Sequence, residues 1–230
     1  MSAFQKYFAD PQFVARYVEK GPAAFMPGHG GVLQMAGVLL AEQVPEDGRV
    51  LIVGAGGGLD TRALAKAGPN WSFVGVDPAP NMLDLARHVV GDEINARLEL
   101  IEGVAADAPD GPFDAATLIL VLGMIADDGS KLATLTEIHR RLKPGAPFVL
   151  VDRCDDRGSP NFERNIKRYV AYAVASGVDA ETVSGAYDSQ KANPGLVTAE
   201  RDEALLVEAG FKMIEVFYVG MNWRGWVGYA

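Results

Sequence analysis

The sequence predicts an α/β fold, in which a doubly wound parallel sheet has helices on both faces. Between residues 49 and 152, short β-branched apolar segments alternate with helical segments about four times. Crossover helices return the chain to the same edge of the sheet, so such strands pair in parallel. Two further strands, 211–219 and 223–229, are joined by a turn near Gly220, so we expect an antiparallel pair at the sheet edge.

The elements follow in order from apolar spacing and turn residues. Two short helices are expected within 2–19, interrupted by Pro11, and a third over 32–44. Core strands are expected over 49–53, 71–77, 97–102, 115–122 and 147–152, with helices over 59–66, 81–90 (Asn81 as N-cap) and 131–142. Residues 162–176 are expected to be helical, 177–195 loop-like, and 200–209 helical up to Gly210.

These elements predict one domain, 1–230, with four parts. An N-terminal helical cap covers 1–44, and a cofactor-binding core covers 45–152. A helical lid insertion covers 153–195, and the final helix and strand pair cover 196–230.

Composition narrows the function classes. The chain has 230 residues, a formal net charge of −9 and one cysteine, Cys154. A single cysteine allows no internal disulfide and no thiolate zinc cage, and three histidines without a close pair predict no metal site. The negative charge argues against nucleic acid and anionic membranes as partners. No signal segment or membrane span is expected, so we expect a cytoplasmic protein. We also expect it to be a monomer or a homodimer.

A glycine turn between a buried strand and a helix is the main functional signal. Gly54-Ala55-Gly56-Gly57-Gly58 follows the strand 49–53, and Asp77 ends the next strand. Such a turn lets the backbone approach a ligand and directs helix N-terminal amides at it, while a strand-end carboxylate accepts hydrogen bonds from ribose hydroxyls. The alternative is a tight turn with an N-capping Asp. Leu59 breaks the dinucleotide pattern GxGxxG, which favours an adenosyl cofactor over NAD.

Four segments carry recognisable motifs: Val50–Gly58, Val74–Met82, Phe113-Asp114-Ala115-Ala116 and Arg141-Leu142-Lys143-Pro144-Gly145. They resemble the motifs of class I S-adenosylmethionine-dependent methyltransferases. The resemblance covers about residues 45–152 and implies a Rossmann-like, seven-stranded sheet that binds S-adenosylmethionine. It implies cofactor contacts from Gly54, Ala55, Gly56 and Gly58 (methionine and ribose), Asp77 (ribose hydroxyls), Pro78, Met82, Val104 and Ala105 (adenine), and Leu120 and Val121 (sulfonium).

Two positions depart from the family pattern. Ile52 stands where an acidic residue often precedes the first glycine, and Val104 stands where many members have Asp. Asp60 and Asp107 are nearby substitutes for the missing partners of the cofactor amino groups.

His29 is the candidate catalytic residue and can also contact the acceptor. It lies in a glycine-flanked loop, and the ordinary pKa of imidazole suits a general base near neutral pH. The alternative, given equal weight, is that His29 hydrogen-bonds the loop or the cofactor carboxylate.

Acceptor-binding candidates follow the fifth strand. Arg153 stands at its end, where it can hold an anionic acceptor or form a salt bridge with Asp152. Tyr169 and Tyr172 share a helix face and can stack on an acceptor or pack on the core. The basic residues of the insertion are interleaved with acids, which argues against RNA.

The favoured function is methyl transfer to an O, N or C nucleophile of a small molecule. Met26-Pro27-Gly28-His29 and Glu208-Ala209-Gly210-Phe211 are also similar to the carboxy-S-adenosylmethionine synthases of tRNA wobble-uridine modification. In those enzymes an arginine before Ala-Gly-Phe holds the extra carboxylate, and Leu205 occupies that place here. That activity and a non-catalytic cofactor-binding protein are the alternatives.

Overall fold

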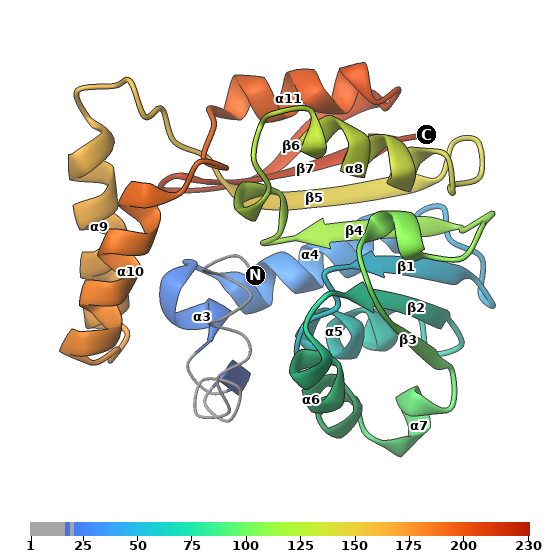
Figure 1. The fold of residues 1–230 in the computed structure, drawn as a ribbon. Helices are drawn as coiled ribbons and strands as arrows, with labels where there is room; N and C mark the ends of the chain where they lie inside the picture. Colours follow the sequence, from blue (N-terminus) through green and yellow to red (C-terminus); the bar gives the residue numbers. More distant parts are fainter. Residues whose placement is uncertain (1–16, 19–20) are drawn as a thin grey trace.

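The computed structural model describes residues 17–18 and 21–230, and its centre is a seven-stranded sheet in the order β3-β2-β1-β4-β5-β7-β6 (Figure 1). The strands are β1 (Arg49–Val53), β2 (Ser72–Asp77), β3 (Leu98–Glu102), β4 (Ala115–Ile119), β5 (Pro147–Arg153), β6 (Lys212–Gly220) and β7 (Trp223–Tyr229). The first five pair in parallel, and β7 is antiparallel to both β5 and β6. The predicted sheet and its antiparallel pair are therefore confirmed.

The helices cover both faces of the sheet and extend beyond one edge. They are α3 (Pro22–Phe25), α4 (His29–Ala41), α5 (Leu59–Ala67), α6 (Pro80–Val90), α7 (Asp92–Asn95), α8 (Ser130–His139), α9 (Phe162–Ala175), α10 (Ala180–Ala192) and α11 (Ala199–Glu208), with 3₁₀ turns at Ala105–Asp107 and Leu122–Met124. Successive strand residues point to opposite faces. Leu51 and Val53 therefore pack with α8 and α11, while Val50 and Ile52 pack with α4 and α5.

The carboxyl ends of the parallel strands meet at one edge, which positions the site. β1 lies between β2 and β4, so the crossovers from β1 and β4 leave toward opposite sides at this point. Ligands of open α/β sheets bind at such a switch point. Helices α9 and α10 stand beyond this edge, beside α3, as Figure 1 shows.

Three local predictions were wrong. Residues 180–192, expected as loop, form α10, because Asp179 accepts a hydrogen bond from the Thr182 amide (2.9 Å) and caps the helix. Only Val183 of α10 is buried, so the segment has little apolar periodicity to reveal it. Helix α6 has Ala79, not Asn81, as its N-cap. Helix α4 begins at His29 because Gly28 adopts a left-handed conformation (φ 68°) just before it.

The two helices expected within 2–19 lie outside the described residues, apart from the helical pair Tyr17 and Val18. Within the described part of the chain, no helix combines the length and apolarity needed to cross a membrane.

Candidate active site

The glycine turn after β1 is held in a conformation that side chains would block. Gly54, Gly56 and Gly58 have φ values of 76°, 47° and 78°, in the left-handed region that favours glycine. A Cβ on Gly54 would lie 2.2 Å from Val121 Cγ2, so the turn touches the end of β4. The turn thus brings Gly54 and Val121 together, as the sequence predicts for a site shared by β1 and β4.

Asp77 closes this turn from the end of β2. Its two carboxylate oxygens accept hydrogen bonds from the Gly56 amide and the Ala79 amide, each at 2.9 Å. Burial raises the pKa of Asp77 above its ordinary value, while the two amide bonds act in the opposite direction. Each oxygen keeps a further lone pair, so the carboxylate can also accept hydrogen bonds from a vicinal diol.

The expected adenine side lies on the loops that follow β2 and β3. Met82 is buried, and its Cε would be 3.9 Å from a Cβ on Gly56, so its side chain reaches the turn. Pro78 is exposed. Ala105 is buried at the start of a 3₁₀ turn, where its N–H has no acceptor within the turn. Val104 is exposed beside it.

The two substitute carboxylates have different positions. Asp107 accepts a hydrogen bond from the Val104 amide (2.8 Å), so it closes the loop after β3. Asp60 lies in the first turn of α5, and desolvation raises its pKa to about 7. A cationic group bound beside Asp60 would stabilise its ionised form.

The loop after β4 is the part of the site with the most backbone constraint. Leu120 has a φ of 61°, which costs energy in a residue with a branched side chain, and its amide donates to Val151 O (2.7 Å). Three side chains hold Leu122 and Gly123 in place. Lys131 Nζ donates to Leu122 O (2.9 Å), Asp152 Oδ2 accepts from the Gly123 amide (2.6 Å), and Asn193 Nδ2 donates to Gly123 O (2.8 Å). Side chains from β5, α8 and the segment after α10 therefore fix the loop that contains Leu120 and Val121.

Tyr17 is a site residue that the sequence analysis missed. A Cβ on Gly57 would lie 2.8 Å from its ring, and one on Gly56 would lie 3.5 Å from its hydroxyl. Burial raises the pKa of Tyr17, and so do the charges of Asp60 and Asp77. Its hydroxyl therefore stays protonated as a hydrogen-bond donor. Its distance in sequence from the glycine turn left no local signal for this contact.

His29 is buried at the N-terminus of α4, with 6% of its surface exposed. Desolvation lowers the pKa of His29 to about 4. At neutral pH the ring is therefore uncharged and has one nitrogen lone pair to accept a proton. The loop before it is held to the end of the sheet, since Tyr218 Oη donates to Pro27 O (2.5 Å).

Arg153 and Tyr169 lie in contact in the structure. Arg153 also bonds to Asp155 and to Gln190 of α10, so its guanidinium already has protein partners. Its guanidinium lies 4.8 Å from the centre of the Tyr169 ring, and Arg153 Nη2 is 2.9 Å from Asp155 Oδ2. Nη1 donates to Gln190 Oε1 of α10 (2.5 Å). Arg153 Nε is buried and, among the described residues, has no hydrogen-bond acceptor. The salt bridge expected with Asp152 is formed with Asp155 instead.

Tyr169 also stacks on Phe25 of α3, with ring centres 5.4 Å apart, and lies 6.3 Å from Trp223. Tyr172 is half-buried one turn further along α9. Burial raises the pKa of Tyr218 in β6, and the electrostatic interaction with Tyr172 raises it further. The two tyrosines therefore join the lid to α3 and to the final strand pair.

Comparisons with known proteins agree with this geometry. Residues 50–145 match the family model for a methyltransferase domain. The carboxy-S-adenosyl-L-methionine synthase of Chromohalobacter salexigens is 24% identical over 210 residues, 89% of this chain and 76% of that protein. The ubiquinone biosynthesis O-methyltransferase of Xanthomonas campestris is 35% identical over 105 residues, but the match covers only 44% of this chain and 41% of that protein.

A solved structure shares the fold over most of this chain. Human N-acetylserotonin methyltransferase in complex with S-adenosylmethionine superposes with a TM-score of 0.57 at 20% identity, over 96% of this chain and 59% of that one. This chain therefore spans less than two thirds of the length of several proteins that it matches.

The glycine turn, the carboxylate at the end of β2 and the clamped loop after β4 define a Rossmann-like methyltransferase site. Residues 50–145 match the methyltransferase domain family, and the fold is that of class I S-adenosylmethionine-dependent methyltransferases. S-adenosylmethionine is its cofactor, and the site fits that molecule. Side chains on Gly54 or Gly56 would occupy the space between Val121, Tyr17 and Met82 that the glycines leave.

Replacing Tyr17 with phenylalanine is expected to weaken cofactor binding by about 1 kcal/mol, or roughly fivefold. The hydroxyl beside Gly56 would be lost while the ring packing on Gly57 remains. Calorimetry with S-adenosylmethionine measures the change. Tyr172→Phe is the matched control, because Tyr172 lies on the lid, and equal losses in the two variants would contradict the assignment.

Proposed function

We propose that the protein transfers the methyl group of S-adenosylmethionine to an O, N or C nucleophile of a small molecule. The observation that carries this proposal is the carboxylate of Asp77 bonded across the glycine turn to Gly56 (2.9 Å). The O-methyltransferase relatives and the acidic net charge support a small acceptor over a polyanion.

The roles proposed for the residues follow their positions. The bound cofactor supplies a methyl group activated on a sulfonium. Asp77 holds the ribose hydroxyls, the glycine turn accommodates the methionine portion, and Met82 packs beside adenine. Leu120 and Val121, held by the clamp after β4, position the methyl-bearing end. Methyl transfer is an in-line displacement, so most of the acceleration comes from holding the nucleophile in line and excluding water.

Acceptor selection is assigned to the cap, residues 1–44, and the lid, residues 153–195. Tyr169 and Tyr172 of α9 are the proposed acceptor contacts. Arg153 lies over the Tyr169 ring and is itself paired with Asp155. His29 accepts the acceptor's proton where the nucleophile must lose one. Its lowered pKa keeps it unprotonated at neutral pH but makes it a weak base, so it suits acceptors that ionise readily.

The pH dependence of stability tests the state of His29. The folded pKa, about 4, is below the ordinary 6.5, so the unfolded chain binds the proton more readily between these values. The folded state therefore loses stability as the pH falls from 6.5 to 4. At pH 5 the loss attributable to His29 is expected to be about 2 kcal/mol.

Urea unfolding of wild type and His29→Gln at pH 7 and pH 5 isolates this contribution. Asp60 and Asp202 have pKa values raised to about 7 and about 6, and they act in the opposite direction in both proteins. The difference between the two proteins is therefore the relevant quantity. The same pH dependence in both would show that His29 titrates normally.

A methyl-acceptor screen with labelled cofactor tests the proposed function directly. We expect label to appear in a phenol, amine, carboxylate or activated carbon acid, and the transfer to be lost in Asp77→Ala. If S-adenosylmethionine failed to bind at millimolar concentration, the proposal would be wrong.

The carboxylated-cofactor synthase is the second candidate, because the Chromohalobacter relative matches most of this chain. Leu205, at the position of the arginine expected in those enzymes, is fully buried in the core between α11 and the sheet. A leucine there supplies no partner for an extra carboxylate. Mass spectrometry of ligand that co-purifies with the protein distinguishes ordinary from carboxylated cofactor.

A further inference from the structure

A cavity outside the cofactor site lies at the far end of the same sheet edge. It is bounded by the chain after β5, the first turns of α9 and α11, and the turn between β6 and β7, and has a volume of about 320 Å³. Its lining residues follow β5 or lie on α9, α11 and β7, whereas the glycine turn and Asp77 lie at the ends of β1 and β2. The cavity is therefore separate from the cofactor pocket.

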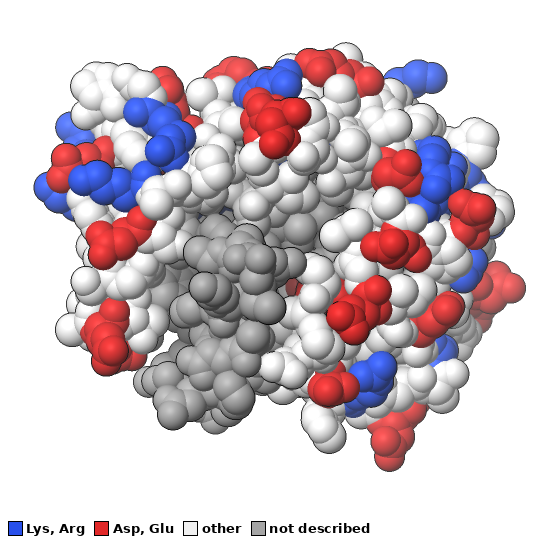
Figure 2. All heavy atoms as spheres, viewed as in Figure 1, with Lys and Arg blue, Asp and Glu red and all other residues white. Residues whose placement is uncertain are grey.

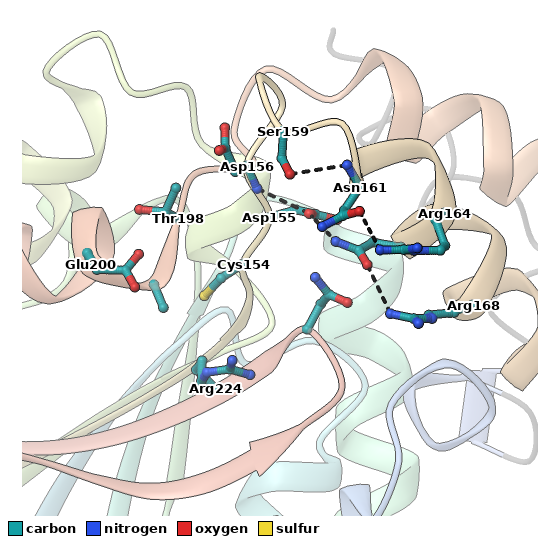
Figure 3. A pocket seen from close by; sticks show the side chains of 13 residues that line it. Cys154, Asp155, Asp156, Ser159, Asn161, Arg164, Arg168, Thr198, Glu200 and Arg224 are labelled. Atoms are coloured by element: carbon teal, nitrogen blue, oxygen red, sulfur yellow. Dashed lines mark hydrogen bonds between the residues drawn. The ribbon is translucent and has the colours of Figure 1, made fainter.

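Three arginines lie around this cavity (Figure 3). Arg164 and Arg168 are four residues apart on α9, so they share one helix side, and Arg224 extends from β7. No carboxylate of the described residues lies within ion-pair distance of these three guanidinium groups. Of the other nine arginines in the described chain, six form such pairs, and Arg62, Arg97 and Arg157 do not. In a chain with 30 acidic and 21 basic residues, this is the arrangement expected where a ligand supplies the negative charge.

Neutral groups orient these arginines. Arg164 donates to Asn161 Oδ1, and Arg168 donates to Asn165 Oδ1 (3.4 Å). Arg224 Nη1 donates to the carbonyl of Met221 (2.8 Å). A guanidinium has five N–H donors, so each arginine keeps donors for a ligand. Figure 2 shows several basic side chains at the upper left of the molecule, with acidic side chains among them.

The acidic residues of the wall only partly offset these charges. Asp155 is buried, and its carboxylate accepts hydrogen bonds from Arg153 Nη2 (2.9 Å) and Asn165 Nδ2 (2.9 Å). Asp156 Oδ1 accepts the Gly158 amide (2.9 Å) within its own turn. Glu200 remains, on the α11 side, where hydrogen bonds from its own backbone and from the Thr198 side chain lower its pKa and the charge of Arg224 adds a smaller effect. The α9 side of the cavity is therefore the positive side.

We infer that this cavity binds a small molecule through an oxyanion, a carboxylate or a phosphate monoester, held by Arg164 and Arg168 with Arg224 opposite. Planar guanidinium groups match the two oxygens of such anions and bind them in pairs. The inference is independent of the proposed methyl transfer. Asp155 contacts Asn165 in the wall of the cavity, and it also contacts Arg153, which lies over the Tyr169 ring. Asp155 is therefore part of the proposed anion site and also holds the arginine that contacts Tyr169.

Binding of inorganic phosphate and of benzoate to the full chain tests this inference by calorimetry at constant ionic strength. We expect at least one probe to saturate one site at millimolar concentration. In Arg164→Gln/Arg168→Gln the affinity is expected to fall about tenfold or more, because hydrogen bonds to a charged ligand are lost. The tighter of the two probes identifies the source of the oxyanion as phosphate or carboxylate.

Lys167→Gln is the matched control. Lys167 lies on the same helix but is paired with Glu163 (3.2 Å) and does not line the cavity. Equal losses of probe affinity in the control and in the arginine variant would show that only the overall positive charge matters, which would contradict the inference. Absence of saturable binding of both probes would overturn it. S-adenosylhomocysteine affinity, measured in the same variants, is expected to be unchanged, so failure here is distinguishable from failure of the proposed function.

Discussion

Replacing Asp77 with alanine is expected to weaken binding of S-adenosylmethionine by about 1–3 kcal/mol, or roughly 5- to 150-fold. Two effects add. The ribose hydroxyls lose their acceptor, and the amides of Gly56 and Ala79 lose theirs, so the turn that faces the cofactor is no longer held in place. Calorimetry with S-adenosylmethionine and with its demethylated product measures the change in affinity.

Glu102→Ala is the control for this prediction. Glu102 ends β3 directly beside Asp77 in the sheet register, carries the same charge and makes no bond to the glycine turn. We expect its affinity to match that of wild type. An Asp77→Ala protein that is folded and binds the cofactor as tightly as wild type would rule out the ribose role.

Replacing Lys131 with methionine is expected to lower the free energy of unfolding by about 3–5 kcal/mol, because it leaves a buried carboxylate without its cation. Lys131 is completely buried, with Nζ 3.4 Å from Asp202 Oδ1, and Cys154 Sγ lies 3.4 Å from the other oxygen of Asp202. The loss of its bond to Leu122 O also loosens the clamped loop after β4.

Urea unfolding at pH 8 and pH 5 measures both the size and the cause of this loss. The pKa of Asp202 is already raised by desolvation to about 6, and Lys131 holds it down from a higher value. Without Lys131 the folded carboxylate takes up a proton more readily, so the deficit is expected to shrink as the pH falls.

Lys143→Met provides the comparison at the surface. Lys143 also forms an ion pair, with Asp114 at 2.6 Å, but its side chain is 47% exposed. Such pairs contribute about 0–1 kcal/mol. Similar losses for Lys131 and Lys143 would show that burial is not the cause.

The fold and the positions of the glycine turn and of Asp77 were predictable because their signals are local. Asp77 follows its strand directly, and the glycine turn lies between a strand and a helix that the sequence itself marks. The interactions that depend on distant segments were not predictable. Tyr17 lies about 40 residues before Gly57, and Arg153 has Gln190 as a partner because α10 lies near the end of β5.

The sequence by itself determined the succession of the seven strands, most of the helices, the glycine turn and the acidic residue at the end of β2. These depend on backbone preferences and apolar periodicity, which act over a few residues. Only the tertiary structure decided that His29 is buried, that Lys131 and Asp202 pair inside the protein, and that three arginines from α9 and β7 surround one cavity. Burial and charge pairing depend on groups far apart in the chain, so they become defined only when the sheet and its lid are assembled.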